Sequence, residues 1–183
     1  MTAQVPDELV YEGKQHCLFS NPLEDYFQKN PPRPNFIPES TAERRGYSAI
    51  WEIRGGALYL SSLSGTLCVK PAERGGRVSS WCRGGHHGQC EIRMATLVDI
   101  FDCPTGEVLA DWFSGDLRVP HGTMVEYVHA GYASRYERYL MIKIEKGLVT
   151  GTRIVGDDEY LREEEARWAE IEKTKKRWWR FWI

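Results

Sequence analysis

Two stretches of this chain, each made of two β-rich runs around a glycine-bearing turn, constrain its fold most. The first reads YSAIWEI, RGG and ALYLSSL over residues 47–63, and the second reads RYLMIKI, EKG and LVTGTRIV over residues 138–155. Apolar and β-branched residues on both sides of such a turn are typical of a β-hairpin. Gly56 and Gly147 occupy the same place in the two stretches. Because a solenoid needs at least three repeats, the pattern predicts two similar hairpins within one domain.

The residues between the two hairpins predict shorter elements. Residues 71–90 have no apolar period, so we expect a Gly-rich loop there. The stretch RMATLVDIF suits a buried strand, and VLADWF and DLRVP suit two short strands. The stretch TMVEYVHAGY fits one short helix, which Thr123 caps and Gly131 stops.

The last residues predict the longest helix of the chain. Asp157 or Asp158 can cap it, and its acidic first half and basic second half both suit the helix dipole. Its apolar residues fall on one stripe: Leu161, Trp168, Ile171, Trp178 and Trp182.

These elements together predict an α+β fold in three parts. Residues 1–45, which contain five closely spaced prolines, form an extended segment packed on the domain. Residues 46–156 form a mainly antiparallel β-sheet, either a sandwich or a partly open barrel built from the two similar hairpins, with one short helix. Residues 157–183 form the long C-terminal amphipathic helix.

Charge is distributed unevenly along the chain. It has 24 basic and 26 acidic residues, a net charge of −2. Five of the basic residues lie near the C-terminal end: Lys173, Lys175, Lys176, Arg177 and Arg180. Without those five, 19 basic residues stand against 26 acidic ones, a net charge of −7. We therefore expect no nucleic-acid partner, and the acidic body favours a basic protein as partner.

The ends and the cysteines of the chain predict its compartment. We expect a cytoplasmic protein, at most peripheral to a membrane, because the sequence shows neither a secretory signal nor an apolar run of about 18 residues. The chain has five cysteines at irregular spacings. An odd number without a regular pattern predicts reduced thiols rather than a disulfide framework.

Residues 81–90, WCRGGHHGQC, hold the residue types that bind metals. Cys82, His86, His87 and Cys90 all lie on one loop, where a structural zinc site usually joins two short pairs of ligands. The spacing favours a Gly-rich loop without a metal, and we predict no metal and no cofactor.

An acid–base pocket can be built from residues between the hairpins. Glu126 and His129 are three residues apart, so they share one face if this segment is helical. The residues that would line the pocket are Asp111, Trp112, His121, Glu126, His129 and Tyr132. No nucleophile motif accompanies them, so we assign no catalytic residue.

The end of the chain, KKRWWRFWI, has two interpretations. The stripe of Trp168, Ile171 and Trp178 packs on the β-domain as core, or the end docks elsewhere. In the second case a partner's groove or a membrane surface receives the tail residues: Arg177, Trp178, Trp179, Arg180, Phe181 and Trp182.

Residues 110–149 carry a longer pattern. They read D-W-F-S-G-x-L-x-V-P-x-G from Asp111 to Gly122 and Y-V-H-x-G-Y-x-S-x-Y-E from Tyr127 to Glu137. Together with the first hairpin, this stretch resembles a family of small uncharacterised bacterial proteins. The resemblance implies a bacterial cytosolic protein, and it brings no activity, cofactor or catalytic residue.

The missing catalytic motifs and the acidic body predict a non-enzymatic protein-binding module. One such module is an immunity-type protein that neutralises a basic toxin. Two alternatives are a small hydrolase-like enzyme that uses His129, Glu126 and Asp111, and a peripheral membrane adaptor that uses the Trp-rich tail. The sequence leaves the oligomeric state open.

Overall fold

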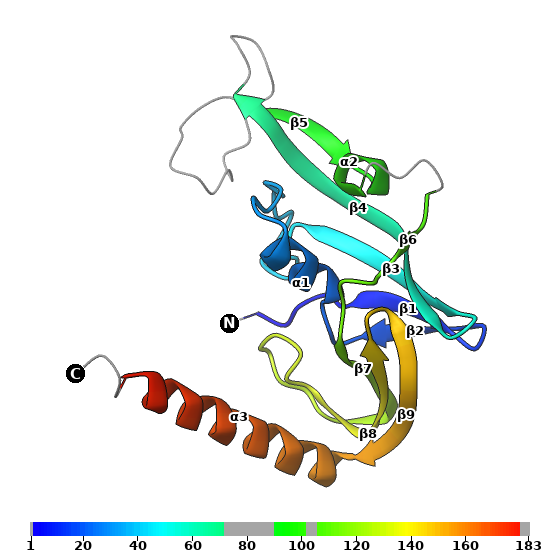
Figure 1. Cartoon of the computed structure of the whole chain (residues 1–183), viewed down its shortest axis with the longest axis vertical. Helices are drawn as coiled ribbons and strands as arrows, with labels where there is room; N and C mark the ends of the chain where they lie inside the picture. Colours follow the sequence, from blue (N-terminus) through cyan, green and yellow to red (C-terminus); the bar gives the residue numbers. More distant parts are fainter. Residues whose placement is uncertain (1, 72–89, 102–105, 180–183) are drawn as a thin grey trace.

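The computed structural model describes residues 2–71, 90–101 and 106–179, which form an open, mainly β structure with few helices (Figure 1). The α+β class is therefore confirmed. In chain order, the elements are β1 (Asp7–Tyr11), β2 (Lys14–Leu18), α1 (Pro22–Lys29), β3 (Tyr47–Arg54), β4 (Ala57–Pro71), β5 (Cys90–Ala95), α2 (Leu97–Phe101), β6 (Val108–Leu109), β7 (Gly115–Glu126), β8 (Arg135–Glu145), β9 (Leu148–Gly156) and α3 (Asp157–Trp179).

All described strands belong to one open sheet. Its order is β2-β1-β3-β4-β9-β8-β7, and β5 and β6 also pair with β4. The pairs are antiparallel except β1 with β3, so the sheet is mixed. Its two ends, β2 and β7, do not pair as strands, and the sheet does not close.

The two predicted hairpins are confirmed, and both turn in the same way. Gly55 and Gly56 have φ angles of 58° and 77° between paired Arg54 and Ala57. Lys146 and Gly147 have φ angles of 49° and 78° in the corresponding turn. Two consecutive positive φ angles match the right-handed twist of the flanking strands, which explains the glycines.

The tips of the two hairpins meet in the middle of the sheet. The N–H of Leu58 donates to the carbonyl of Gly147 at 2.8 Å, and the N–H of Val149 donates to the carbonyl of Gly56 at 2.8 Å. These four residues occupy equivalent places in the two hairpins, so the contact is nearly symmetric. It joins β4 to β9 and makes one sheet from two hairpins.

Residues 1–45 contain more regular structure than an extended segment. Leu9 of β1, Leu18 of β2 and Leu23 of α1 are fully buried in the main core. Pro22 lies at the start of α1, where its fixed φ suits a helix. A backbone N–H at this position would have no intrahelical acceptor, so none is lost. The proline that seemed to exclude a helix therefore begins one.

Two shorter elements differ from the sequence-based expectation. The helix predicted from Thr123 to Gly131 is wrong, because β7 continues to Glu126, which pairs with Arg135 of β8. The strand predicted from RMATLVDIF is only half correct, because β5 ends at Ala95 and α2 follows. The length of β7 is set by its pairing with β8, which the local spacing of apolar residues does not reveal.

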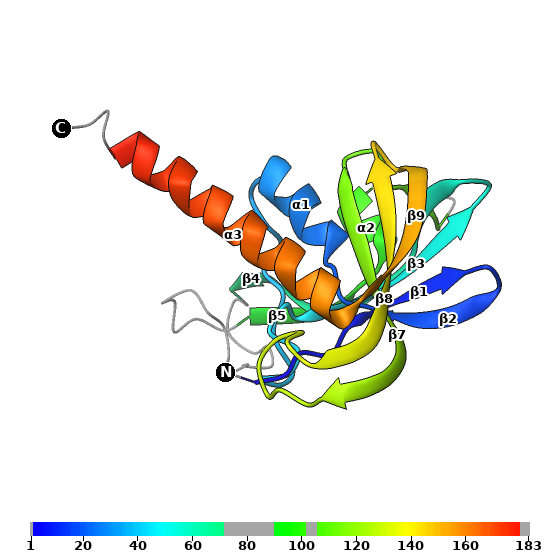
Figure 2. The ribbon, with the colours of Figure 1, turned by 90° about the horizontal axis from the view of Figure 1, so that it is seen from below.

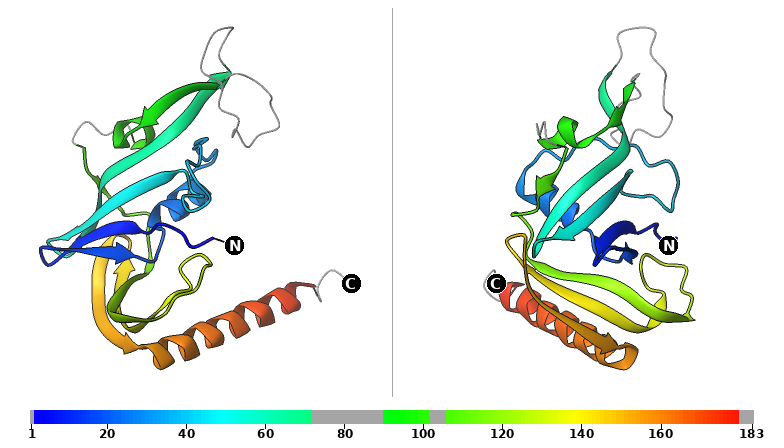
Figure 3. Two further views of the ribbon diagram at one scale, coloured as in Figure 1. Left: turned by 180° about the vertical axis from the view of Figure 1, so that it is seen from behind. Right: turned by 90° about the vertical axis from the view of Figure 1, so that its right-hand side faces the viewer.

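The helix α3 begins directly after β9 and extends away from the sheet, as the views from opposite sides show (Figures 1 and 3). Seen from below, only its first turns lie near β8 and β9 (Figure 2). The helix predicted from residue 157 is therefore confirmed as an element.

Candidate functional site

A second, smaller core anchors the first turn of α3. Successive residues of a strand face opposite sides of a sheet, so Ile142 faces the main core and Tyr139 and Met141 face the other side. There they pack with Val155 of β9 and Tyr160 of α3. The rings of Tyr139 and Tyr160 are 4.5 Å apart, and Tyr160 is 8% exposed. This core fixes where α3 starts.

Arg118 of β7 lies among aromatic rings at the same place. Its guanidinium is 5.0 Å from the ring of Tyr160, 5.8 Å from that of Tyr139 and 5.5 Å from that of Phe19. It also donates a hydrogen bond to the hydroxyl of Tyr160. Burial raises the pKa of Tyr160 to about 12, although the positive charge of Arg118 opposes this. The hydroxyl therefore stays protonated at neutral pH.

Two ion pairs fix the direction of α3. Arg135 Nε donates to Asp157 Oδ2 at 2.9 Å, and Arg135 also pairs with Glu126 at 3.0 Å. Six residues further along α3, Glu163 accepts two hydrogen bonds from Arg153 of β9, at 2.7 and 2.6 Å. A bidentate arginine–carboxylate pair restricts orientation as well as distance. The helix is therefore held at its start by packing and by charge.

Beyond this anchor, the described side chains of α3 are open to solvent. Every side chain from Glu165 to Thr174 is exposed. Trp168 is 58% exposed and Ile171 is 37% exposed. The interpretation in which these two residues pack on the β-domain as core is therefore wrong. An exposed tryptophan and isoleucine on one face of a fixed helix form a candidate docking surface.

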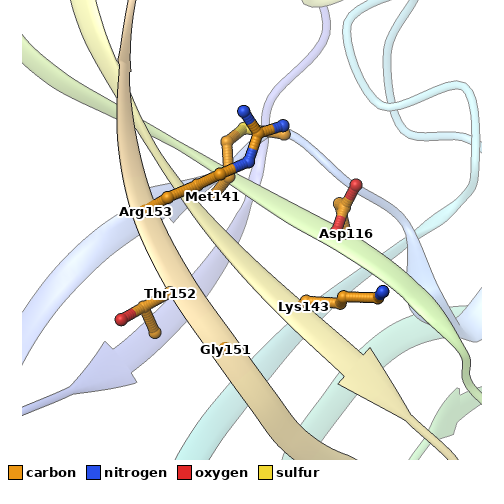
Figure 4. A pocket seen from close by; sticks show the side chains of 6 residues that line it. All are labelled: Asp116, Met141, Lys143, Gly151, Thr152 and Arg153. Atoms are coloured by element: carbon orange, nitrogen blue, oxygen red, sulfur yellow. The ribbon is translucent and has the colours of Figure 1, made fainter.

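A shallow pocket lies beside the anchor, on the face of β7, β8 and β9 that carries the small core. It has a volume of about 320 Å³, and Gly151 leaves it open because a side chain there would meet no atom within 4 Å. Asp116, Lys143 and Arg153 lie on one side of these strands, whereas Thr152 points away (Figure 4). The charge of Arg153 is already neutralised by Glu163. The opposite charges of Lys143 and Asp116 then leave the pocket nearly neutral.

The residues predicted to line an acid–base pocket are spread over different contacts. Glu126 is occupied by Arg135 at 3.0 Å, and His129 Nδ1 lies 2.9 Å from the hydroxyl of Tyr127. The helical face that would bring Glu126 to His129 does not exist, because β7 runs through Glu126. His121 is exposed on β7, opposite Arg138 of β8.

The other predicted pocket residues hold separate parts of the fold together. The indole N–H of Trp112 donates to the carbonyl of Pro22 at 3.1 Å, and its ring stacks on Phe101. Tyr132 stacks on Phe19 with 5.2 Å between ring centroids. Asp111 is exposed in the turn after β6. The described contacts link Asp111 to neither Glu126 nor His129.

The predicted tail and loop residues lie only partly within the described structure. Arg177, Trp178 and Trp179 belong to the helical range of α3. The tail residues that follow lie outside the described residues: Arg180, Phe181 and Trp182. Three candidate metal ligands of the loop lie outside them as well: Cys82, His86 and His87.

Metal-binding and membrane-spanning features were sought in the described residues. No group of three histidine, cysteine or acidic side chains there could hold a metal ion. Across the same parts of the chain, every helix is too short or too polar to cross a bilayer. Cys17 is a free, exposed thiol, whereas Cys68 takes part in a disulfide bond, so the prediction of reduced cysteines is wrong for Cys68.

The residues that build this site are not evident from sequence patterns. Arg118, Arg135 and Arg153 look like ordinary polar residues of strands, and Tyr160 lies at the edge of the apolar stripe of α3, where no local pattern marks it as the anchor. Comparison of the chain with protein-family models, with curated proteins and with solved structures finds no match. The function therefore has to be argued from this geometry.

Proposed function

We propose that this protein is a non-enzymatic protein-binding module and that α3 is its docking helix. The observation that supports this best is the contrast along α3. Its start is fixed by Tyr160 and by the pair of Arg153 with Glu163, whereas Trp168 and Ile171 are exposed. A rigidly held helix with an exposed apolar face suits recognition by a helix-binding partner.

The arrangement of the acid–base candidates supports binding over catalysis. A general base must reach the proton that it abstracts, and a partner usually orients it. Here the nearest polar neighbour of His129 is Tyr127, and Glu126 is held by Arg135. The described contacts therefore assemble no acid–base pair around a common pocket.

Charge favours a basic protein as the partner. The chain without its five C-terminal basic residues carries 19 basic and 26 acidic residues. An acidic surface speeds association with a basic protein and raises the salt dependence of binding. A basic toxin neutralised by an immunity-type protein would fit this charge, and so would other basic proteins.

Site-specific photo-crosslinking in the source cell tests the docking surface. A photoreactive phenylalanine analogue replaces Trp168 on the apolar stripe, and in a matched variant it replaces Lys173, whose side chain is 74% exposed on the outer side of α3. We expect discrete protein adducts from position 168 and few from position 173. Equal labelling from the two positions, or no protein adduct at 168, would refute the docking surface.

The membrane alternative is tested with the Trp-rich tail. Lipid surfaces attract helices with aromatic residues and basic neighbours. The full chain and a chain ending at Thr174 are floated with vesicles that contain anionic lipid. We expect neither chain to float with the vesicles. Flotation of the full chain alone would favour a peripheral membrane adaptor instead.

A further inference from the structure

We infer that the partner of α3 contacts it with a basic amphipathic helix, which lies along the exposed stretch of α3 over residues 165–174. This inference rests on the proposed function, because it takes α3 as the docking helix and a basic protein as the partner. It adds the secondary structure of the contacting segment and the place of its positive charges. Every side chain of this stretch of α3 is exposed.

The apolar part of the contact is a pair of neighbouring side chains. Trp168 and Ile171 are 58% and 37% exposed. They are three residues apart, which places them on one face of the helix. At about 100° per residue, Ile171 lies about 20° around the helix axis from Tyr160, and Trp168 lies about 80° from it. The apolar pair therefore faces the same side as the anchoring ring of Tyr160, about two to three turns further along, where it is open to solvent.

Glu165 and Glu172 form an acidic edge beside this apolar pair. Both are exposed, and they are seven residues apart, which is about 10.5 Å along the helix. Both lie within about 60° of Trp168 around the helix axis. The helix dipole favours acidic residues in the first turn of a helix, so it does not account for these two. Within the described residues, the side chain of Glu165 forms no ion pair or hydrogen bond.

The opposite edge of the apolar pair carries little net charge. Arg167 lies on that edge and is paired with Glu164, three residues earlier. Further round the helix, Glu170 and Lys173 pair with each other at 3.5 Å. Negative charge is therefore concentrated on one side of the apolar pair. A partner segment complements this face when positive charge flanks its own apolar residues on one side.

The spacing of the acidic edge favours a helix as the partner segment. Side chains of a helix return to nearly the same line after seven residues, which is also about 10.5 Å. A helix laid alongside α3 therefore brings one lysine or arginine to Glu165 and another to Glu172, with apolar residues between them. The contact is short, because residues 165–174 span about 15 Å, so we expect it to be reversible.

Two synthetic peptides test the charge of the partner helix. Both are three heptads long with leucine and isoleucine at the inner positions, and the flanking positions hold lysine in one peptide and glutamate in the other. Binding of each labelled peptide to the full chain is measured by fluorescence anisotropy at low ionic strength. We expect the lysine peptide to bind about tenfold more tightly, because two charge pairs that repel in the glutamate peptide attract in the lysine peptide.

Charge reversal at the acidic edge tests the contact itself. Glu165→Lys is expected to abolish the preference for the lysine peptide, and Glu165→Lys combined with Glu172→Lys is expected to reverse it. Glu170→Lys is the matched control and should keep the preference, because Glu170 is 72% exposed and lies about 140° around the helix from Glu165. Trp168→Ala should weaken the binding of both peptides. Circular dichroism of all variants confirms that each remains folded.

Three results of the peptide assay would overturn the basic helix. They are equal binding of the two peptides, no binding of either peptide, and a loss of preference in Glu170→Lys as large as that in Glu165→Lys. Sedimentation of the chain without peptide tests a different occupant. A wild-type chain at twice its mass of 21.1 kDa, together with a monomeric Trp168→Ala variant, would assign the face to a second copy instead.

Mapping of the crosslinked segment separates this inference from the proposed function. The protein adducts that the photoreactive residue at position 168 forms in the cell are digested, and the attached partner peptide is sequenced by mass spectrometry. We expect a segment with lysine or arginine at seven-residue spacing beside apolar residues. An adduct to a segment without this pattern refutes the basic helix and leaves the docking surface standing. The absence of any protein adduct refutes both.

Discussion

At the scale of single residues, a buried carboxylate connects β1 to the first hairpin. Asp7 is 1% exposed, and its Oδ1 accepts hydrogen bonds from the N–H of Ala49 at 3.1 Å and from Arg45 at 2.8 Å. Its Oδ2 accepts a hydrogen bond from the indole of Trp51 at 3.1 Å. Burial raises the pKa of Asp7, and the charge of Arg45 acts against this shift. Each oxygen of this buried group therefore has a partner.

Replacing this carboxylate should destabilise the whole fold. Asp7→Ala removes the only acidic partner that Arg45 has among the described residues, although Arg45 keeps neutral acceptors, and it leaves the indole N–H of Trp51 buried without its acceptor. Breaking a buried pair from one side costs about 3–5 kcal/mol. Urea unfolding followed by tryptophan fluorescence measures this loss, with Glu8→Ala at the exposed neighbouring position as the control. A loss no larger than that of the control would show that the network contributes no stability.

The turn glycines of the two hairpins allow a second residue-scale prediction. Gly55 and Gly147 have φ angles of 58° and 78°, so alanine is strained at both, by about 1–2 kcal/mol. A Cβ on Gly147 would also lie 2.9 Å from the backbone of Ala110, whereas one on Gly55 would meet nothing within 4 Å. Gly147→Ala should therefore lower the free energy of unfolding more than Gly55→Ala. Equal losses in thermal unfolding would contradict the close approach to Ala110.

At the scale of elements, α3 is held by residues of its first two turns. Tyr160 and Glu163 hold the helix, and the stripe residues Trp168 and Ile171 remain exposed. The sequence predicted the helix well, because its charge pattern is a local property, although Asp157 and Asp158 lie in its first turn. The sequence did not decide whether the stripe packs on the β-domain or docks elsewhere, because that depends on the direction in which the helix leaves the sheet.

The anchor of α3 is expected to weaken in acid. The hydrogen bonds from Arg153 hold the pKa of Glu163 below its usual value of 4.5. Since the folded pKa is the lower one, the pair stabilises the docked helix above about pH 4.5, and this stabilisation is lost as the pH falls through the folded pKa. The pair is partly exposed, so the effect is at most about 1 kcal/mol.

Hydrogen exchange of the first turns of α3 checks this dependence. After correction for the intrinsic exchange rate, protection should be lower at pH 3.5 than at pH 6. In Glu163→Gln the same amides should exchange faster at pH 6 and change less with pH. The exposed Glu165→Gln serves as the matched control. Unchanged protection in Glu163→Gln would mean that the aromatic core alone holds the helix.

Elements also differ in how far the sequence determined them. Both hairpins were predictable, because glycine at positive φ and flanking β-branched residues act within a few residues. The end of β7 was not, because Met124 and Glu126 are strand residues only through their pairing with Tyr136 and Arg135. Tertiary pairing overrides a weak local helix preference there.

At the scale of the whole molecule, one main core serves both hairpins. It includes Trp51 and Leu58 of the first hairpin and Ile142 and Ile144 of the second. The tips of the hairpins are also joined by two backbone hydrogen bonds. The two halves of the sheet are therefore expected to unfold together, although their strands pair only at one point.

A cavity at this junction tests that cooperativity. Leu58 is fully buried, so Leu58→Ala should lower the free energy of unfolding by about 2–5 kcal/mol. Far-UV circular dichroism and tryptophan fluorescence should still change at the same urea concentration, because one core spans both hairpins. Separate transitions in the variant would show that the hairpins fold as independent units.

The sequence by itself determined the two hairpin turns and the presence of the last helix, because backbone conformation at glycine and the charge pattern of a helix depend on neighbouring residues only. The tertiary structure alone decided that β7 extends past Thr123, that Arg118 lies among aromatic rings, and that Glu126 pairs with Arg135 while His129 lies against Tyr127. These features join residues far apart in the chain, and their positions depend on how the whole sheet is assembled rather than on local spacing.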